Sequence, residues 1–395
     1  MNSYLAEWRN LFRYWKSDLL AGITVGIVAL PLALGFAITT GAPASAGLAS
    51  AIVAGFVAAF FGGSNFQVSG PTGAMTVILV PIVASYGLQS LVLLGIAAGS
   101  LIIVMSLLRL GKWIDAVPWA VMEGFTLGIA LIIALQQIPL IFDVPKADGK
   151  HTLSVAYTTF VYALHLPLNW ASILIVLSTV AIKRLWPTVK GKLGIRIHIP
   201  ASILAIIVMT SIAQLFSLDI RRIGELPRSL SFTSDFSMVD ISISHFAYAA
   251  IVIAMLGAIE SLLSARVADG IVKSSKHEPN RELFGQGLAT IASACFGGLP
   301  ATGAIARTTV NVHAGAKSRL AAIIHSIFLL LVVFFLAPVV SVIPTAALAG
   351  VLLGTSLRIA TPRSIREALT TTYDLRIVYI VTALSVLAKI GRAHV

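Results

Sequence analysis

The sequence is short of charge. Only 11% of its 395 residues are Asp, Glu, Lys or Arg, whereas soluble domains have roughly 25%. The single cysteine, Cys295, excludes an internal disulfide and a cysteine-based metal cluster. The sequence has no P-loop motif, no nucleophile-and-base arrangement and no metal-ligand pattern, so it predicts no enzyme, no cofactor and no metal site. With 57% hydrophobic residues, the protein is expected to expose its surface to lipid.

What the sequence has instead is long apolar runs. A helix needs about 20 apolar residues to cross the hydrocarbon core of a bilayer. The candidate spans are residues 18–40, 46–62, 71–86, 88–108, 117–138, 169–186, 199–217, 244–268, 283–298, 303–315, 319–336, 343–358 and 374–389. The tenth span would be roughly 18 Å long as a helix, too short to cross. We therefore expect an all-α polytopic membrane protein with irregular third and tenth spans.

Lysine and arginine are distributed unevenly over the loops. With the N-terminus in the cytoplasm, the outer loops receive only Lys146, Lys150, Arg221, Arg222 and Arg228. This bias predicts a cytoplasmic N-terminus in the inner or plasma membrane, and it accounts for the net charge of +12 without nucleic-acid binding. The start, MNSYLAEWRNLFRYWKSD, lacks the pattern of a cleavable signal peptide and is expected to lie on the cytoplasmic membrane surface.

Two distant stretches share an unusual pattern. FFGGSNFQVSGPTGAMTVIL (60–79) and CFGGLPATGAIARTTVN (295–311) both contain Phe-Gly-Gly, then Pro, then Thr-Gly-Ala. Gly- and Pro-interrupted segments at matching places in two halves indicate a transporter binding site. Each stretch comes third in its half, and an odd number of spans per half inverts the second half. The alternative interpretation is a pair of kinked helices packed through small residues.

The repeated pattern predicts an anion site. Irregular backbone at membrane depth must be buried in protein or line a wet cavity. Residues 66–69 and 299–301 should therefore be extended, dip to mid-membrane and turn into half-helices that start near Pro71 and Gly303. Two helix starts facing each other attract an anion. The residues expected to offer backbone N–H groups and little bulk are Thr72, Gly73, Ala74, Gly303, Ala304 and Ile305.

Charged residues within the spans are further candidates. Arg307 lies one turn into the tenth span, where a buried Arg is costly and usually functional. Its guanidinium group can bind carboxylate, sulfate or bicarbonate through two parallel hydrogen bonds. The alternative is that the side chain snorkels inward as an ordinary cation. Glu260, deep in the eighth span, either pairs with Arg307 or a helix start, or is kept neutral by burial; both suit proton coupling. Ser264 lies one turn on, on the same face.

Two other titratable residues carry weaker expectations. Glu123 in PWAVMEGFTLG opens the fifth span and is expected to be a helix-start carboxylate stabilised by the helix dipole. His325 in the eleventh span is expected to be a packing histidine with satisfied hydrogen bonds rather than a proton relay.

These segments resemble the SulP sulfate-permease family of anion transporters over essentially the whole chain. The resemblance rests on the 60–79 stretch and on DLLAGITVGIVALPLALGFAI, AMLGAIESLLSARVADG, KHEPNRELFGQGLATIASACFGG and ATGAIARTTVNVHAGAKSRLAAIIHS. The last three are most similar to the proton-coupled C4-dicarboxylate (DauA-like) branch. The resemblance implies a uracil-permease-type fold of seven plus seven inverted spans, with two half-helices meeting at the midplane. Spans one to four and eight to eleven would form a mobile core, and the others a gate.

The resemblance also implies a function. This function is secondary active transport of sulfate or a related oxyanion or carboxylate by alternating access. The alternatives are a C4-dicarboxylate transporter, a bicarbonate transporter or an anion channel of the same fold. Phe36 matches the aromatic residue that lines the family's anion pocket, with simple packing as the alternative. Sodium-driven bicarbonate members have Asp at the place of Glu260 and a hydroxyl residue at that of Ile305, so this chain favours protons. The implied partners are a small anion, protons, the lipid bilayer and a second copy in a homodimer.

The expected organisation follows from the repeats. A cytoplasmic lead-in (1–17) precedes core and gate domains of the first repeat (18–112 and 113–243), the core domain of the second repeat (244–337) and an incomplete second gate domain (338–389). Residues 390–395, IGRAHV, resemble a translated sequencing adapter. We therefore expect the natural sequence in this chain to end near Lys389. The chain would then be a fragment of a longer gene product, cut before the fourteenth span and before the regulatory STAS domain that most of the family carries.

Overall fold

The computed structural model describes residue 8 and residues 11–112, 118–149, 152–192, 200–233, 241–272, 276–370 and 372–390. Within these ranges the protein is predominantly helical, and seven helices are long and apolar enough to cross a membrane. The chain divides into two compact units. The first contains Met1–Met75, Tyr86–Asp115 and Pro227–Ala337, and the second contains Thr76–Ser85, Ala116–Leu226 and Pro338–Val395.

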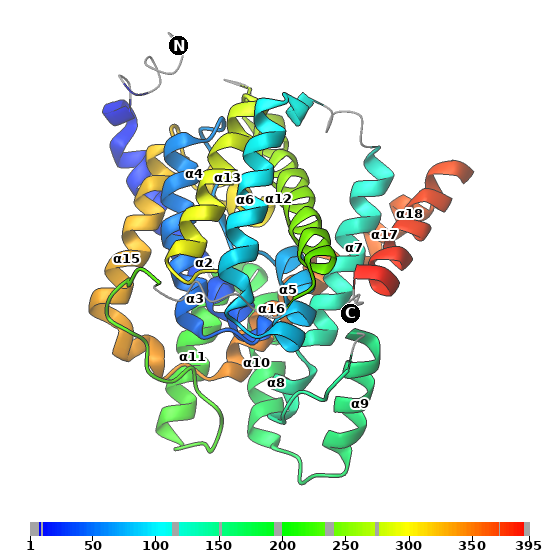
Figure 1. Ribbon diagram of the computed structural model, residues 1–395. Helices are drawn as coiled ribbons and strands as arrows, with labels where there is room; N and C mark the ends of the chain where they lie inside the picture. Colours follow the sequence, from blue (N-terminus) through cyan, green and yellow to red (C-terminus); the bar gives the residue numbers. More distant parts are fainter. Residues whose placement is uncertain are drawn as a thin grey trace. The chain divides into compact units, whose positions relative to one another are not determined.

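The first unit contains both short strands. Its elements are η1 (Leu11–Tyr14), α2 (Trp15–Thr40), α3 (Ala44–Ala49), the π-helical η2 (Ser50–Ala54), α4 (Gly55–Phe61), β1 (Ser69–Gly70), α6 (Ser90–Leu107), α12 (Ile243–Ile271), α13 (Pro279–Cys295), β2 (Thr302–Gly303), α14 (Ile305–His313) and most of α15 (Leu320–Ser341). The helix α5 (Gly73–Tyr86) begins in this unit and continues in the second. Helices α2, α4, α6, α13 and α15 run alongside one another (Figure 1).

Glycines set how closely α13 approaches its neighbours in the first unit. A Cβ on Gly99 of α6 would lie 2.7 Å from the carbonyl oxygen of Gly287 in α13. A Cβ on Gly285 would overlap the backbone of Gly62 at the end of α4. Real side chains cannot occupy such positions, so glycine permits backbone-to-backbone contact here. Helix α13 therefore packs closely against α6 and α4.

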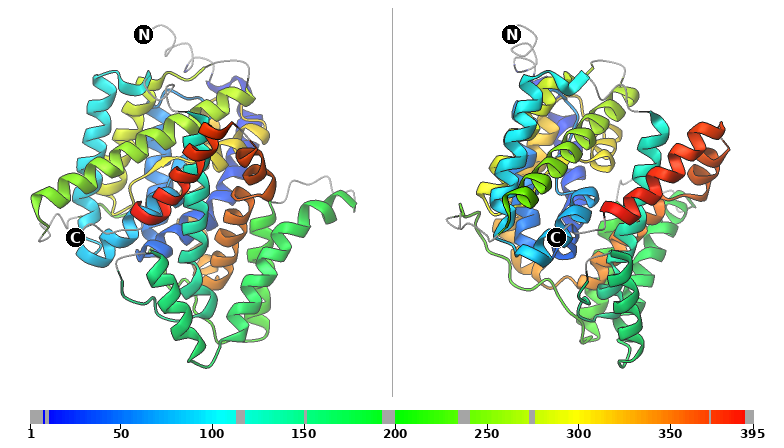
Figure 2. Two further views of the ribbon diagram at one scale, coloured as in Figure 1. Left: turned by 90° about the vertical axis from the view of Figure 1, so that its right-hand side faces the viewer. Right: turned by 45° about the vertical axis from the view of Figure 1, so that its right-hand side comes forward.

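Where the structure describes it, the second unit consists of helices, loops and one isolated β-bridge between Arg222 and Pro344. Its elements are α7 (Trp119–Gln136), α8 (Ile138–Phe142), α9 (Thr152–Leu164), α10 (Trp170–Lys192), α11 (Ala201–Leu215), α16 (Thr345–Ile359), α17 (Pro362–Leu369), α18 (Tyr373–Ser385) and the π-helical η4 (Val386–Ile390). Figure 2 shows α17 and α18 beside α7, where Ala120, Ala368 and Tyr379 form a buried cluster. Between α10 and α16, Lys183 Nζ donates to Val351 O and Thr355 Oγ1, both at 2.7 Å.

The structure departs from the sequence-based expectation in three helices. Residues 139–142, 152–164 and 362–369 lie outside the predicted spans, but the structure has α8 (which begins at Ile138), α9 and α17 there. Helix α9 has 13 residues, too few to be recognised as a span by a criterion of about 20 apolar residues. Helix α17 is amphipathic, with charged residues such as Arg366 among its apolar ones, so its apolar residues do not form a continuous run.

The N-terminal lead-in is described at Trp8 and from Leu11 onward. The Trp8 ring packs against Phe60 with 4.6 Å between ring centroids, and the Arg319 guanidinium lies 5.6 Å from the Trp8 ring centroid. At Trp8 the lead-in therefore packs on protein, and its place on the membrane surface stays a prediction. The adapter-like residues Gly391 to Val395 lie outside the described residues.

The two units group much as the predicted core and gate do, with differences at two places. The first unit resumes at Pro227, whereas the sequence analysis assigns residues up to 243 to the gate. Thr76–Ser85 cluster with the second unit, whereas the sequence analysis assigns the whole third span to the core. The predicted domain boundaries stay a prediction.

Candidate functional site

The two repeated stretches meet as crossing extended segments. Strands β1 and β2 pair antiparallel, with Ser69 opposite Gly303 and Gly70 opposite Thr302. Each leads at once into a half-helix, α5 at Gly73 and α14 at Ile305. The expected extended segments are thus present, and the second half-helix starts close to Gly303 as predicted. Pro71, expected at the first helical position, lies two residues before α5, and the Thr72 hydroxyl accepts the Met75 N–H at 3.4 Å.

Glu260 joins the two crossing segments. Thr72 Oγ1 donates to Glu260 Oε2 at 2.8 Å, and Thr302 Oγ1 donates to the same oxygen at 2.7 Å. The two hydroxyl oxygens lie 3.2 Å apart. The threonines occupy equivalent positions of the two Thr-Gly-Ala motifs, so one carboxyl group from α12 bridges both repeats. Thr302 was not among the predicted site residues, although the repeated motif contained the signal for it.

Two of the expected backbone donors just before the second half-helix are already occupied. Gly303 N–H donates to Ser261 Oγ at 3.0 Å, and Ala304 N–H donates to Val68 O at 3.0 Å. The expectation that these two groups are free for an anion is therefore wrong in this conformation. The reason is that β2 must satisfy its own backbone before the helix begins. Among the described hydrogen bonds none uses the N–H groups of Ile305, Gly73 or Ala74, so these three stay available.

Arg307 lies inside the first unit rather than at its edge. It is 1% exposed, and its Nη2 donates to the Pro71 carbonyl immediately before α5. Its Nε and Nη1 are buried without a hydrogen-bond partner. The structure thus corrects two alternatives: this arginine does not snorkel to the membrane surface, and no ion pair with Glu260 occurs among the described residues. A side chain at Gly70 would overlap Arg307 Nη1, so that glycine makes room for the guanidinium.

The remaining polar face of α14 is held by the first repeat. Thr308 Oγ1 accepts the Val68 N–H at 3.1 Å and lies 2.8 Å from Ser264 Oγ. Asn311 Nδ2 donates to Phe66 O at 2.8 Å. Ser264, predicted to act with Glu260, therefore contacts α14 in the described structure. Its position one turn from Glu260 is confirmed by the helix, but its direct partner is Thr308.

A polar stripe on α13 supports both extended segments and was missed in the sequence. Glu282 accepts N–H groups of the first segment, Gln286 Nε2 donates to Ala301 O at 2.7 Å, and Ser293 Oγ donates to Leu299 O at 2.7 Å. Thr290 completes the stripe, and all four residues are at most 1% exposed. Their spacing of four, four and three residues places them on one helical face. That periodicity of polar residues within a predicted span was the available signal.

Three other predicted residues make no described side-chain hydrogen bond to this cluster. Phe36 is 7% exposed and follows Pro31 within α2, but no described hydrogen bond or ring contact links it to Glu260. Glu123 is not in the first turn of α7, which corrects its assignment as a helix-start carboxylate. His325 is fully buried, and neither ring nitrogen has a hydrogen-bond partner, so the expectation of satisfied hydrogen bonds is wrong.

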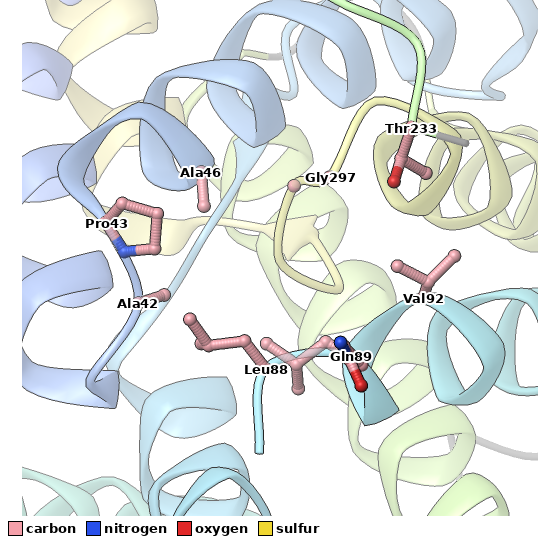
Figure 3. A pocket seen from close by; sticks show the side chains of 10 residues that line it. Ala42, Pro43, Ala46, Leu88, Gln89, Val92, Thr233 and Gly297 are labelled. Atoms are coloured by element: carbon pink, nitrogen blue, oxygen red, sulfur yellow. The ribbon is translucent and has the colours of Figure 1, made fainter. Parts of the chain in front are cut away.

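The first unit also contains a pocket at another place. Its volume is about 190 Å³, and it lies between the α2–α3 turn at Pro43, the start of α6 at Gln89 and Val92, and the end of α13 at Gly297 (Figure 3). None of the predicted site residues lines it. Its lining is mostly small and apolar, so the pocket offers no charge for an anion.

Comparison with known proteins identifies the family. Residues 15–381 match the model of the sulfate permease family. The chain is 38% identical over 360 residues to the putative sulfate transporter YvdB of Bacillus subtilis, covering 87% of this chain and 64% of that protein. It is 32% identical over 354 residues to the bicarbonate transporter BicA of Picosynechococcus, covering 86% of this chain and 61% of that protein. The chain thus spans less than two thirds of these curated relatives.

Solved structures agree in fold. The transmembrane domain of a cyanobacterial bicarbonate transporter, BicA, has a TM-score of 0.88 at 28% identity and is covered over 97% of its length by 96% of this chain. The murine anion transporter Slc26a9 in its inward-facing state has a TM-score of 0.80 at 18% identity, with 95% of this chain and 66% of that one covered. The chain therefore belongs to the sulfate permease family, and its spans and crossing half-helices form the seven-plus-seven inverted-repeat fold.

Proposed function

We propose that the chain is the membrane part of a secondary active anion transporter, in which an anion binds where α5 and α14 begin. The observation that carries this proposal is the bridging of Thr72 and Thr302 by Glu260 Oε2. Two helix starts from inverted repeats converge on one point, and helix starts favour negative charge. The described structure has the protein's own carboxyl group at that point.

The same geometry supports coupling to protons. An ionised Glu260 brings negative charge to the convergence of the two helix starts, where a substrate anion would bind, and the two charges repel at short range. A proton on Glu260 removes that charge, so the protonated protein binds the anion more readily. Proton and anion would then move together by alternating access. Ser264 joins this scheme through Thr308 on α14, which it contacts at 2.8 Å.

Arg307 is the proposed second contributor to anion binding. Its Nε and Nη1 are buried and unpartnered, so the guanidinium retains donors for an oxyanion or carboxylate. The proposed donors are Gly73, Ala74 and Ile305 through their backbone, with Thr72 released when Glu260 is protonated. Gly303 and Ala304 shape the site through their small size, and Phe36 is proposed to line it.

The substrate is proposed to be sulfate or a related oxyanion or carboxylate. Similarity to a putative sulfate transporter supports sulfate, and similarity to BicA supports bicarbonate as the second candidate. The motif resemblance to the proton-coupled dicarboxylate branch supports C4-dicarboxylates. Ile305 offers no hydroxyl group for a sodium ion, which favours protons as the coupling ion. The distribution of Lys and Arg over the loops supports a cytoplasmic N-terminus and a place in the inner membrane. We also propose that the protein is a homodimer.

The test is uptake of labelled anions into proteoliposomes. Sulfate, bicarbonate and succinate are offered separately, each with and without an inward proton gradient. We expect acid-driven uphill uptake of at least one of them by the wild type, and loss of that uphill uptake in Glu260→Gln with anion binding retained, because Gln imitates the protonated side chain but cannot release a proton.

Two outcomes would contradict the proposal. Unchanged gradient-driven accumulation in Glu260→Gln would remove the coupling role of this residue. Anion flux that never exceeds equilibrium in the wild type would instead favour an anion channel of the same fold, because a channel needs no cycling carboxyl group.

A further inference from the structure

We propose that Glu282 and Gln67 are positioning residues of the anion site: the Glu282 carboxyl group holds the Gln67 amide flat on Gly303 and so sets the crossing of β1 and β2. The inference rests on the proposed function for its binding readout. Neither residue was among the predicted site residues, and neither contacts the proposed anion position directly.

Glu282 organises the turn before β1. Its Oε2 accepts the N–H groups of Gly63 and Ser64, both at 2.9 Å. Its Oε1 accepts Gln67 Nε2 at 2.6 Å. Glu282 is 1% exposed and Gln67 is 5% exposed, so water does not compete for these bonds. One carboxyl group on α13 therefore fixes both the backbone of the turn and one side chain that projects from the extended segment.

Gln67 in turn contacts the second repeat. A Cβ on Gly303 would overlap the Gln67 amide, so the amide lies directly over the Gly303 backbone. Its Oε1 is buried without a hydrogen-bond partner. The amide orientation thus depends on the single described bond from Nε2 to Glu282. Without that bond, the amide is free to turn toward a partner for its oxygen.

The position of Gly303 determines the rest of the site. Its N–H donates to Ser261 Oγ at 3.0 Å, and its neighbour Thr302 donates to Glu260. The adjacent Ala304 N–H bonds to Val68 O, next to Gln67. A shift of Gly303 therefore moves Thr302 relative to Thr72, and the two helix starts no longer converge on one point. Helix α13 does not touch the proposed anion, but in this way it controls the positions of Thr72 and Thr302.

The test is a rescue experiment on solubilised full chain. The variants are Gln67→Met, Gly303→Ala, and the double variant Gln67→Ala/Gly303→Ala. Melting temperature and affinity for sulfate, bicarbonate and succinate are measured for each. We expect Gly303→Ala to lower both strongly, because its methyl group collides with the amide. Adding Gln67→Ala should restore much of the melting temperature by removing the colliding atoms, whereas the anion affinity should stay weak because the bond to Glu282 is lost. Gln67→Met keeps the volume but loses the bond, and we expect about tenfold weaker anion binding with a small change in melting temperature.

Two matched controls make the rescue specific. Gly270→Ala on α12 has nothing within 4 Å of its new Cβ and should behave as the wild type. Gly285→Ala collides with the Gly62 backbone, so Gln67→Ala should not rescue it. Lack of rescue of the melting temperature at Gly303, or wild-type affinity in Gln67→Met, overturns the inference. If the wild type binds none of the three anions, the proposed function fails, and the melting temperatures alone still decide whether Gln67 packs on Gly303 as described.

Discussion

The two half-helices begin alike and differ within one turn. Subtracting 230, the spacing of Thr72 and Thr302, places Val77, Ile78 and Pro81 of α5 at the positions of Arg307, Thr308 and Asn311 of α14. All three α14 residues are polar and at most 1% exposed. On α5, Val77 instead packs with Ile132 and Val386 in an apolar cluster of the second unit.

This difference shows how an inverted repeat becomes an asymmetric site. The backbone of both halves supplies a strand followed by a helix start, so the dipoles are shared between repeats. The side chains are not shared. Of the two half-helices, α14 contributes a cation, Arg307, which donates to the Pro71 carbonyl. Thr308 and Asn311 of α14 bond the backbone of Val68 and Phe66. Thus α14 is anchored by polar contacts and α5 by apolar contacts. Each prediction below tests that division.

The largest effect is expected from Gly70→Ala. The new Cβ would overlap Arg307 Nη1, and the backbone at Gly70 has φ of 154°, a conformation disfavoured for residues with a side chain. Strain and displacement of the buried arginine together should cost about 3 kcal/mol or more of folding free energy. Thermal unfolding in detergent measures it.

Gly87→Ala is the matched control for strain. Its φ of 75° is also positive, but nothing lies within 4 Å of the new Cβ. We expect a cost of about 1 kcal/mol there. Equal losses at both positions would show that backbone strain alone matters and that Arg307 does not depend on the space at Gly70.

The next effect is expected in anion affinity at Arg307. Arg307→Ala should weaken binding by roughly tenfold or more, because hydrogen bonds to charged groups are worth about 1.5–3 kcal/mol. Arg307→Lys should lose less, since it keeps the charge but not the planar fork. Binding should be reduced rather than abolished, because the N–H groups of the helix starts remain. Calorimetric titration of the three proteins measures this, and equal affinities would leave the site to the helix dipoles.

The smallest effect is expected from changing the polarity of one buried residue on each half-helix. Thr308→Val removes the partner of the Val68 N–H and should cost about 1–3 kcal/mol of folding free energy. Val77→Thr buries a hydroxyl group within the cluster of Ile132 and Val386 and should also cost about 1–3 kcal/mol. Chemical or thermal unfolding of each variant is the measurement. An unchanged free energy of unfolding at either position would mean that the contrast between α5 and α14 contributes little to stability.

The sequence predicted the structure best where Gly and Pro interrupt the apolar runs. The repeated Phe-Gly-Gly, Pro and Thr-Gly-Ala pattern was sufficient to predict two extended segments and two half-helices, but not the pairing of the segments as β1 and β2. It could not predict which backbone donors are already used, because the partners Ser261 and Val68 come from other elements. Likewise, Glu260 was recognised as a buried carboxyl group, but its bonds to Thr72 and Thr302 depend on how α12 is rotated about its axis.

Other differences have simple physical origins. Helix α9 was missed because 13 residues fall below the length that a span requires. His325 was assigned satisfied bonds because buried polar groups usually have them, and the structure leaves both nitrogens without a partner. The α13 stripe was overlooked because the apolar content of the span outweighed its regularly spaced Glu282 and Gln286.

The buried polar faces of α13 and α14 have a consequence for how the protein is made. At the centre of a helix, a residue such as Asp, Lys or Arg costs about 2.5–3.5 kcal/mol to insert from the translocon into lipid. Helix α14 carries Arg307 and α13 carries Glu282, and their described partners come from elements synthesised more than 200 residues earlier. Each of these charges makes insertion of its helix into lipid less favourable. We therefore expect both helices to insert more readily against a first repeat that is already in the membrane, so that the order of synthesis becomes part of the folding pathway.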